Sequence, residues 1–325
     1  MTHEHTHGDH HQHGHAQVDF GRAFAIGLVL NTGFVIVEVA YGLAAGSTAL
    51  LADAGHNLSD VLGLVLAWGS FTLARRAPTD RFTYGYRGST ILAALFNALL
   101  LLVALGGIAL EAVQRILDPA PVAGATVSLV ALVGIAVNGI TAWMFAGGRR
   151  HDINIRGAYL HMLADAAISA GVAVSGLLVL WTGKSVIDPV TSLVIVAYIF
   201  WGTWGLLRQS VAMSLSAVPT HIDLAGVEAE LLASPGVARV HDLHVWHMST
   251  TEIALTAHLV MPDGSKGDAF LSDVHERLAH NHAINHATIQ IETGADCTGH
   301  NHSCGYTIVS GRTRRSNVSS STRRS

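Results

Sequence analysis

The sequence predicts an α-helical membrane protein with six transmembrane helices, followed by a small C-terminal α+β domain. Half of the 325 residues are hydrophobic and only 13% are charged, which is about half the charged fraction of an ordinary soluble domain. The charges are uneven: between Phe24 and Leu207 they are scarce and cluster between long apolar stretches. The formal net charge of −4, without a basic stripe before the last residues, argues against a nucleic-acid partner.

The N-terminal tail, residues 1–17, is rich in histidine, with seven of the 21 histidines of the chain in its first 15 residues. Such a stretch cannot bury a core, so we expect it to be disordered. As a functional element it would collect metal ions with low affinity. The alternative is an expression tag, which the interspersed spacing of the histidines disfavours.

Six apolar segments occupy residues 18–208, and each is near or above the ~20 residues that span a bilayer as a helix. They cover approximately residues 20–43, 48–74, 88–114, 122–146, 155–181 and 187–207. The loops on one side of the membrane hold most of the basic residues, namely Arg75, Arg76, Arg81, Arg87, Arg149, Arg150, Arg156 and Arg208. By the positive-inside rule, both termini are then cytoplasmic. The first choice of location is a multi-pass protein of the cell's inner membrane, and a eukaryotic vesicle membrane is the alternative.

Two of these segments contain a His four residues before an Asp. The second segment has His56 and Asp60, and the fifth has His161 and Asp165. Residues four apart share one face of a helix. Two such helices packed face to face would present two imidazoles and two carboxylates to one point, which suits a divalent metal such as Zn²⁺. A lone intramembrane His is more simply explained by hydrogen bonding between helices, but a repeated pair is not.

Three other polar residues within the spans allow more than one interpretation. Asp53 lies three residues before His56, on a similar face, and either lines the pathway or orients its helix. Glu38 is a proton relay or a polar contact between helices, and we favour the contact. Asn57 is expected to face away from Asp60 and to pack.

Residues 209–293 form the predicted α+β domain, in which one face of a sheet is covered by two helices. The expected elements are a helix at 221–233, strands at 237–248 and 252–261, a helix at 267–282 and a strand at 286–292. Simple alternation places His241 and His247 on one face of the first strand and His244 on the other. His241, His258, His286 and Glu292 would then converge on a second metal site.

The C-terminal tail, residues 294–325, contains a Cys/His cluster and a Ser/Arg-rich end that we expect to be disordered. Two thiolates and two imidazoles within eight residues suit zinc or another soft metal. They are Cys297, His300, His302 and Cys304. Whether this cluster folds around a metal or acts as a loose chelator stays open.

With these motifs in hand, the chain resembles the cation diffusion facilitator family of zinc-exporting antiporters, over residues 18–293. It is most similar to the bacterial zinc, cobalt and cadmium efflux branch and to the eukaryotic zinc transporters. The resemblance rests on GSTALLADAGHNLSD, RFTYGY, NIRGAYLHMLADAAISAG, IDPVTSL, HDLHVW and HATIQIE, in the order that the family has them.

The resemblance implies a homodimer with six spans per protomer and a cytoplasmic, ferredoxin-like C-terminal domain. The two His–Asp pairs would form the transport site between the second and fifth spans. His241, His258 and Glu292 match metal-binding positions of the cytoplasmic domain, with His286 a neighbour. Zn²⁺ would be both the substrate and a regulatory ligand, and Cd²⁺ and Co²⁺ are further possible substrates.

The chain departs from some family members at two places. Phe82 and Tyr86 stand where a loop metal site would need His, so no site is expected there. Gly88 and Leu215 replace a Lys–Asp pair that locks some dimers.

Two other classes of function compete with export by proton antiport. A metal-storage or metal-sensing membrane protein would explain the many histidines, but it would not need charged ligands buried in two spans. An intramembrane metalloenzyme is disfavoured because the sequence has no HExxH motif and no spare general base.

Overall fold

The structure is a computed structural model that describes residues 20–147, 153–264, 266–294, 306–309 and 312–315. The described chain forms two compact units. The first holds the chain up to Val61 together with Val103–Ile199, and the second holds Leu62–Leu102 and the chain from Phe200 onward. Long helices α2, α3 and α6 contribute to both units, so each unit is described by itself.

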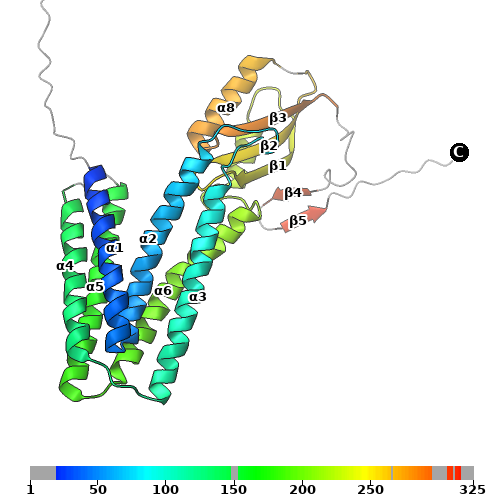
Figure 1. The fold of residues 1–325 in the computed structure, drawn as a ribbon. Coiled ribbons are helices and arrows are strands. Elements are labelled where there is room, and N and C mark those ends of the chain that lie inside the picture. The colour runs from blue at the N-terminus through cyan, green and yellow to red at the C-terminus, as the bar shows by residue number, and fades with distance from the viewer. Residues whose placement is uncertain (1–19, 148–152, 265, 295–305, 310–311, 316–325) are drawn as a thin grey trace, which may run out of the picture. The chain divides into compact units, whose positions relative to one another are not determined.

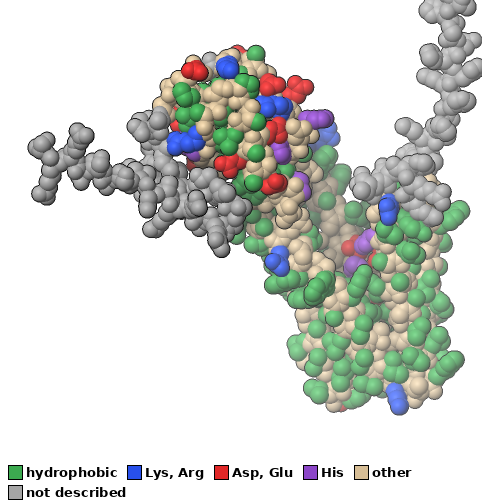
Figure 2. Space-filling view, turned by 180° about the vertical axis from the view of Figure 1, so that it is seen from behind, with side chains coloured by type: hydrophobic (Ala, Val, Ile, Leu, Met, Phe, Trp, Pro, Cys, Tyr) green, Lys and Arg blue, Asp and Glu red, His purple; other side chains and the backbone are tan. Residues whose placement is uncertain are grey.

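All six expected spans are helices that are long and apolar enough to cross a membrane. They are α1 (Phe20–Ala45), α2 (Thr48–Ala74), α3 (Ser89–Leu117), α4 (Gly124–Phe145), α5 (Ile153–Thr182) and α6 (Ile187–Ser214) (Figure 1). Apolar side chains cover the surface of these helices (Figure 2), as expected of surfaces that face lipid. Helix α6 continues to Ser214, beyond the expected end at 207, because hydropathy marks where a helix leaves the hydrocarbon and not where it stops.

In the first unit, α4 packs against both α1 and α5 (Figure 1). Glycines allow the close approach. A Cβ on Gly134 would lie 2.5 Å from Phe34 of α1 and 2.9 Å from Ser169 of α5. Gly124 and Gly176 lie backbone to backbone, since a Cβ on either would come within 2.8 Å of the other's carbonyl oxygen. Small residues at helix crossings are the usual means of packing in membranes, and here they bring α5 into place.

A buried carboxylate of α6 caps the start of α2. The Asp188 side chain accepts hydrogen bonds from the Thr48 backbone N–H at 2.7 Å, from the Thr48 hydroxyl at 3.0 Å and from the Ser47 hydroxyl. These groups include donors that a helix N-terminus otherwise leaves unpaired. The first turn of α2 is therefore fixed to α6, two turns before the expected metal ligands of α2.

The second unit contains the expected α+β domain. Its elements are α7 (Leu224–Leu232), β1 (Arg239–His247), β2 (Ile253–Val260), α8 (Asp268–His282) and β3 (His286–Glu292). The strands form one sheet in the order β1-β2-β3, with β1 antiparallel and β3 parallel to β2. Both helices cover one sheet face, where a single core forms around Leu231, Leu255, Leu259, Val274 and Leu278. The order of elements confirms the predicted α+β arrangement.

One prediction about this sheet is wrong. The pairing of β1 with β2 shifts between His241 and His244, because Asp242 adopts a left-handed φ of 51° and forms a β-bulge. His241 pairs with His258, His244 pairs with Thr256, and His247 pairs with Ile253 of the core face. The extra residue therefore puts His244 on the face of His241 and moves His247 to the opposite face, which alternation alone could not foresee.

Two features of the second unit lie outside the expected elements. Strands β4 (Tyr306–Val309) and β5 (Arg312–Arg315) pair antiparallel, and β5 lies in the Ser/Arg-rich end that was expected to be disordered. The loop after α2 contacts the α+β domain, since Arg87 lies 3.1 Å from the Glu252 carboxylate. In the same loop, the Phe82 and Tyr86 rings lie 4.8 Å apart.

Candidate metal sites

The two His–Asp pairs of the helical region meet at one point in the first unit. His56 Nε2 lies 3.8 Å from Asp60 and 3.3 Å from Asp165, and His161 Nε2 lies 3.3 Å from Asp60 and 3.7 Å from Asp165. Each imidazole thus faces both carboxylates, one from its own helix and one from the other. The i, i+4 spacing aligns each pair on α2 or α5, and the packing of α5 brings the two faces together.

This arrangement has the properties of a cation site. Ligand atoms of His56, Asp60 and Asp165 lie within 4.8 Å of one another. Both carboxylate oxygens of Asp165 and Oδ2 of Asp60 are buried and make no hydrogen bond among the described residues. Their only close partners in the site are the two imidazoles, at 3.3 to 3.8 Å, and a divalent cation would satisfy these buried carboxylate oxygens together. Exposure rises from 0% for Asp165 to 43% for His161, so the site is open on the His161 side.

A second layer of buried polar groups supports these ligands. Asp53 accepts a hydrogen bond of 2.8 Å from Ser169 of α5, one turn beyond Asp165. Asn57 donates to Glu38 of α1 at 3.0 Å. The Asp53 contact ties α2 to α5, which favours the helix-orienting interpretation, and Glu38 makes the interhelical polar contact that we favoured. Neither the Ser169 contact nor the Asn57 partner could be found in the sequence, because spacing along one helix does not say what lies on the next.

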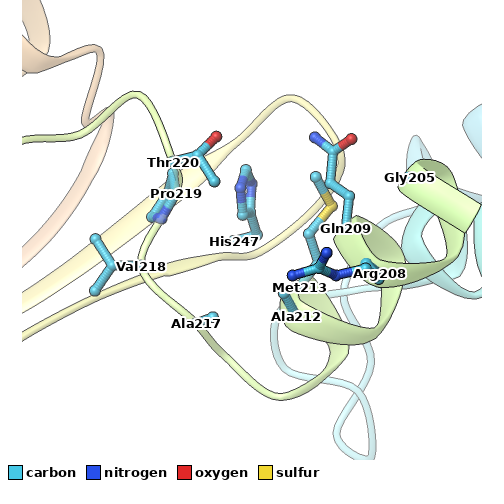
Figure 3. A pocket seen from close by; sticks show the side chains of 10 residues that line it. All are labelled: Gly205, Arg208, Gln209, Ala212, Met213, Ala217, Val218, Pro219, Thr220 and His247. Carbon is cyan, nitrogen blue, oxygen red and sulfur yellow. The ribbon is translucent and has the colours of Figure 1, made fainter.

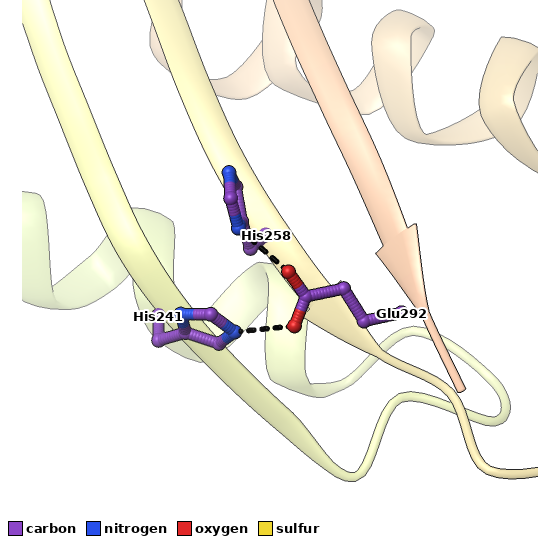
Figure 4. Close-up of side chains that lie close together, drawn as sticks. All are labelled: His241, His258 and Glu292. Atoms are coloured by element: carbon purple, nitrogen blue, oxygen red, sulfur yellow. Dashed lines mark hydrogen bonds and ion pairs between the residues drawn. The ribbon is translucent and has the colours of Figure 1, made fainter. Parts of the chain in front are cut away.

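A separate cluster lies on the open face of the sheet (Figure 4). Glu292 Oε2 accepts a hydrogen bond of 2.9 Å from His241 Nε2, and Oε1 accepts one of 2.9 Å from His258 Nδ1. His241 and His258 are direct partners across β1 and β2, and Glu292 ends β3 next to them. Burial opposes ionisation of Glu292, but the hydrogen bonds from His241 and His258 hold its pKa below the usual value. Two imidazoles and an ionised carboxylate fit zinc.

His286 does not join this cluster. It begins β3, opposite Ala254, whereas Glu292 ends the same strand opposite Val260. Six residues of strand separate them by about 20 Å. His286 instead lies against the Tyr84 ring, with ring centroids 5.6 Å apart. The prediction that His286 is a neighbouring ligand is wrong for this reason.

The structure adds one acidic residue near this cluster. Asp242, in the β-bulge, lies 3.1 Å from His244 Nε2 and 3.5 Å from His258 Nε2. Asp tolerates a left-handed backbone better than most residues. The Asp in the HDLH stretch was therefore the one sequence feature that could have indicated the β-bulge. The remaining predicted ligands, Cys297, His300, His302 and Cys304, lie outside the described residues, as do the N-terminal histidines.

Comparison with known proteins places both units in one family. Residues 24–213 match the family model of the cation efflux transmembrane domain, and residues 219–294 match that of the cation efflux protein cytoplasmic domain. The chain is 33% identical to the zinc transporter ZitB of Escherichia coli strain K12, over 93% of this chain and 99% of that protein.

Two further relatives cover most of the chain. The cadmium, cobalt and zinc/H⁺-K⁺ antiporter of Bacillus subtilis strain 168 is 32% identical, over 89% of this chain and 93% of its own length. The metal cation efflux system protein CzcD of Cupriavidus metallidurans is 35% identical, over 83% and 86%.

Six spanning helices followed by a cytoplasmic α+β domain define a multi-pass membrane transporter and not an enzyme. The chain belongs to the cation diffusion facilitator family of cation efflux proteins.

Proposed function

We propose that this chain exports divalent metal ions from the cytoplasm in exchange for protons. Zn²⁺ is the first substrate, and Cd²⁺ and Co²⁺ are further ones. This substrate range is supported by the names of the relatives, which include a zinc transporter and a cadmium, cobalt and zinc antiporter. Alternating access would proceed around the transport site, composed of His56, Asp60, His161 and Asp165.

The observation that carries this proposal is the crossed geometry of the transport site. Each imidazole lies within 3.8 Å of both carboxylates, and the buried carboxylate oxygens have no hydrogen-bond partner among the described residues. Ligands from α2 and α5 contribute equally, so a change in the distance between these helices would alter the two contacts that cross between them, His56–Asp165 and His161–Asp60. Imidazole nitrogens favour zinc and other later transition metals over Mn²⁺, which prefers oxygen ligands.

Exchange for protons follows from the chemistry of these ligands. A metal ion binds neutral imidazole and ionised carboxylate, so metal and protons compete for the same four side chains. Facing the cytoplasm, the site would load the metal. Facing a more acidic exterior, His56 and His161 would take up protons and release it, since imidazole titrates near neutral pH.

The sheet site, composed of His241, His258 and Glu292, would bind zinc as a regulatory ligand. To hold the metal, the ring nitrogens of His241 and His258 that face Glu292 would have to be the unprotonated ones, with the proton of each neutral imidazole on its other nitrogen. Metal bound there would favour one arrangement of the paired cytoplasmic domains of a homodimer and so bias the transport cycle.

The arginines of the cytoplasmic loops support an inner-membrane orientation with both termini inside.

The decisive experiment is zinc uptake into proteoliposomes under a proton gradient. We expect the Asp60→Ala and Asp165→Ala variants to lose transport by at least about 100-fold, more than the loss of an outer partner of a metal ligand causes. Asp118→Ala is the matched control, because Asp118 is an exposed carboxylate just beyond the end of α3, and it should transport at the wild-type rate.

Survival of uptake in both transport-site variants would show that the site is misassigned. If the wild type moves no divalent metal, export itself is wrong, and the storage or sensing alternative takes its place.

A further inference from the structure

A cavity of about 470 Å³ lies in the second unit, where α6 continues into the α+β domain. Its walls are the last turns of α6, the linker of residues 217–220 and one side chain of β1. The His247 ring projects between the linker, with Thr220 and Pro219, and α6, with Gln209 and Met213 (Figure 3). Neither candidate metal site contributes a residue to this cavity.

The polar groups of the cavity are suited to an anion. Arg208, Gln209, Thr220 and His247 line it, and none of its ten described lining residues is acidic. Arg208 is exposed and has no ion-pair partner in the part of the chain that the structure describes. His247 contributes an imidazole ring to the lining. A guanidinium is the side chain best suited to bind phosphate oxygens, and the Thr220 hydroxyl and the His247 imidazole are further polar groups of the lining.

The position of the cavity selects the kind of anion. About 20 residues of helix cross the hydrocarbon core, so α6, which begins at Ile187, leaves the hydrocarbon near residue 207. Arg208 therefore comes at the level of the lipid headgroups. The rest of the lining is largely apolar, with Ala212, Met213 and Val218. A small inorganic anion would leave this apolar wall without a partner.

We propose that this cavity binds the headgroup of an anionic phospholipid, with the phosphate against Arg208 and the glycerol end of the lipid along the apolar wall. Thr220 and His247 would contact the polar substituent of the headgroup. Anionic lipids attract basic residues at the cytoplasmic surface, and the cavity would add a defined binding site to this electrostatic attraction. The bound lipid would join α6 to the linker that leads into the α+β domain. This inference goes beyond metal export and does not depend on it.

Native mass spectrometry of the full chain tests the proposal. Protein purified in a zwitterionic lipid would be titrated with phosphatidylglycerol, and the bound lipids per protomer counted. We expect one tightly bound phosphatidylglycerol in the wild type. Arg208→Gln should weaken its binding about fivefold to tenfold, the effect of losing one charged contact near a membrane surface. Ala212→Phe should weaken it as well, by filling the cavity without changing charge.

Arg76→Gln is the matched control, because Arg76 is an exposed arginine two residues beyond the end of α2, outside the cavity lining. Its lipid binding should stay within about twofold of wild type. An equal loss in Arg76→Gln and Arg208→Gln would overturn the proposal in favour of diffuse surface charge. A second arm adds inorganic phosphate: if phosphate binds in an Arg208-dependent way and the lipid does not, the occupant is a free anion and the proposal is wrong. Unchanged binding in both cavity variants would also overturn it.

Discussion

The transport site and the sheet site use almost the same donors but hold them in different ways. In the transport site, two imidazoles and two carboxylates come from α2 and α5, and among the described residues no backbone hydrogen bond joins those two helices. In the sheet site, His241, His258 and Glu292 sit on adjacent strands whose backbones are hydrogen-bonded, so strand pairing determines the ligand spacing. Relative movement of two helices can open the first site, whereas the second is held rigid.

The two sites also differ in what compensates their charge. Buried oxygens of Asp60 and Asp165 have no hydrogen bond among the described residues, while both oxygens of Glu292 accept hydrogen bonds from histidines. Without metal, the carboxylates of the transport site have only ion-pair contacts with His56 and His161, at 3.3 to 3.8 Å, whereas the sheet site is already hydrogen-bonded. A transport site must bind its ion and then release it, whereas a regulatory site needs only to bind it. The difference in construction matches the different tasks that we propose for the two sites.

The largest effect on stability should come from breaking the contact that fixes α2. Asp188→Ala removes the hydrogen-bond acceptor of Ser47 and of the first turn of α2, and we expect it to cost about 3 kcal/mol, because buried donors are left unpaired. Thermal unfolding of the purified chain measures the loss, and transport should fall with it.

The control for this variant comes from the α+β domain. Asp223 caps α7 through one exposed hydrogen bond of 3.1 Å to Ala225, so Asp223→Ala should cost only about 1 kcal/mol. Equal losses in the two variants would contradict the special role given to Asp188.

The next prediction concerns a variant that should affect the sheet site and leave the transport site intact. Glu292→Gln removes the charged ligand of the sheet site, and we expect zinc to bind there about 10-fold to 100-fold more weakly, as when a metal site loses a supporting group. Zinc-dependent protection of the β3 amides from hydrogen exchange reports this site alone, even in the full chain. Transport at saturating zinc should change less than about twofold, since α2 and α5 are untouched.

Glu276→Gln, an exposed change on α8, should leave the midpoint of zinc protection unchanged. Loss of transport as complete as in Asp165→Ala would show that the sheet site is essential for the cycle and not regulatory.

These residues show how far sequence reasoning reaches. The i, i+4 spacing of His56–Asp60 and His161–Asp165 defines a helix face locally, so the sequence predicted the composition of the transport site. The order of helices and strands followed from hydrophobic periodicity in the same way. His247 was placed on the wrong face because one bulged residue at Asp242 inverts all later alternation. His286 was misplaced because strand direction, which places it at the far end of β3 from Glu292, depends on pairing with β2. Asp188 and Ser169 act across large sequence separations, and no local pattern signals their partners.

The stability of the α+β domain should depend on pH through His247, the histidine that the β-bulge places on the opposite face of the sheet. Burial lowers the pKa of His247, and the nearby His221 lowers it further, although a hydrogen bond to the Ser249 backbone opposes them. The folded state thus binds this proton less tightly than the unfolded chain. Stability is full above pH 6.5, the ordinary pKa of His, and falls as the pH drops below it toward the lowered value.

His247→Gln should remove this contribution, so the drop in the unfolding midpoint between pH 7.5 and 5.5 should be smaller than in wild type. His280→Gln, an exposed change on α8, should keep the wild-type dependence. A drop as large in His247→Gln as in wild type would mean that other groups cause it.

The smallest effect should come from the ion pair that links the loop after α2 to the domain carrying the sheet site. Arg87 and Glu252 lie 3.1 Å apart, but their side chains are 39% and 42% exposed, and exposed pairs contribute at most about 1 kcal/mol. Arg87→Gln should therefore lower the unfolding midpoint slightly in 50 mM salt and not measurably in 1 M salt, where screening removes the attraction. Arg76→Gln, an exposed arginine two residues beyond the end of α2, should have no effect at either salt concentration. A loss in Arg87→Gln that persists in 1 M salt would mean that packing of the arginine stem, and not its charge, holds the loop to the domain.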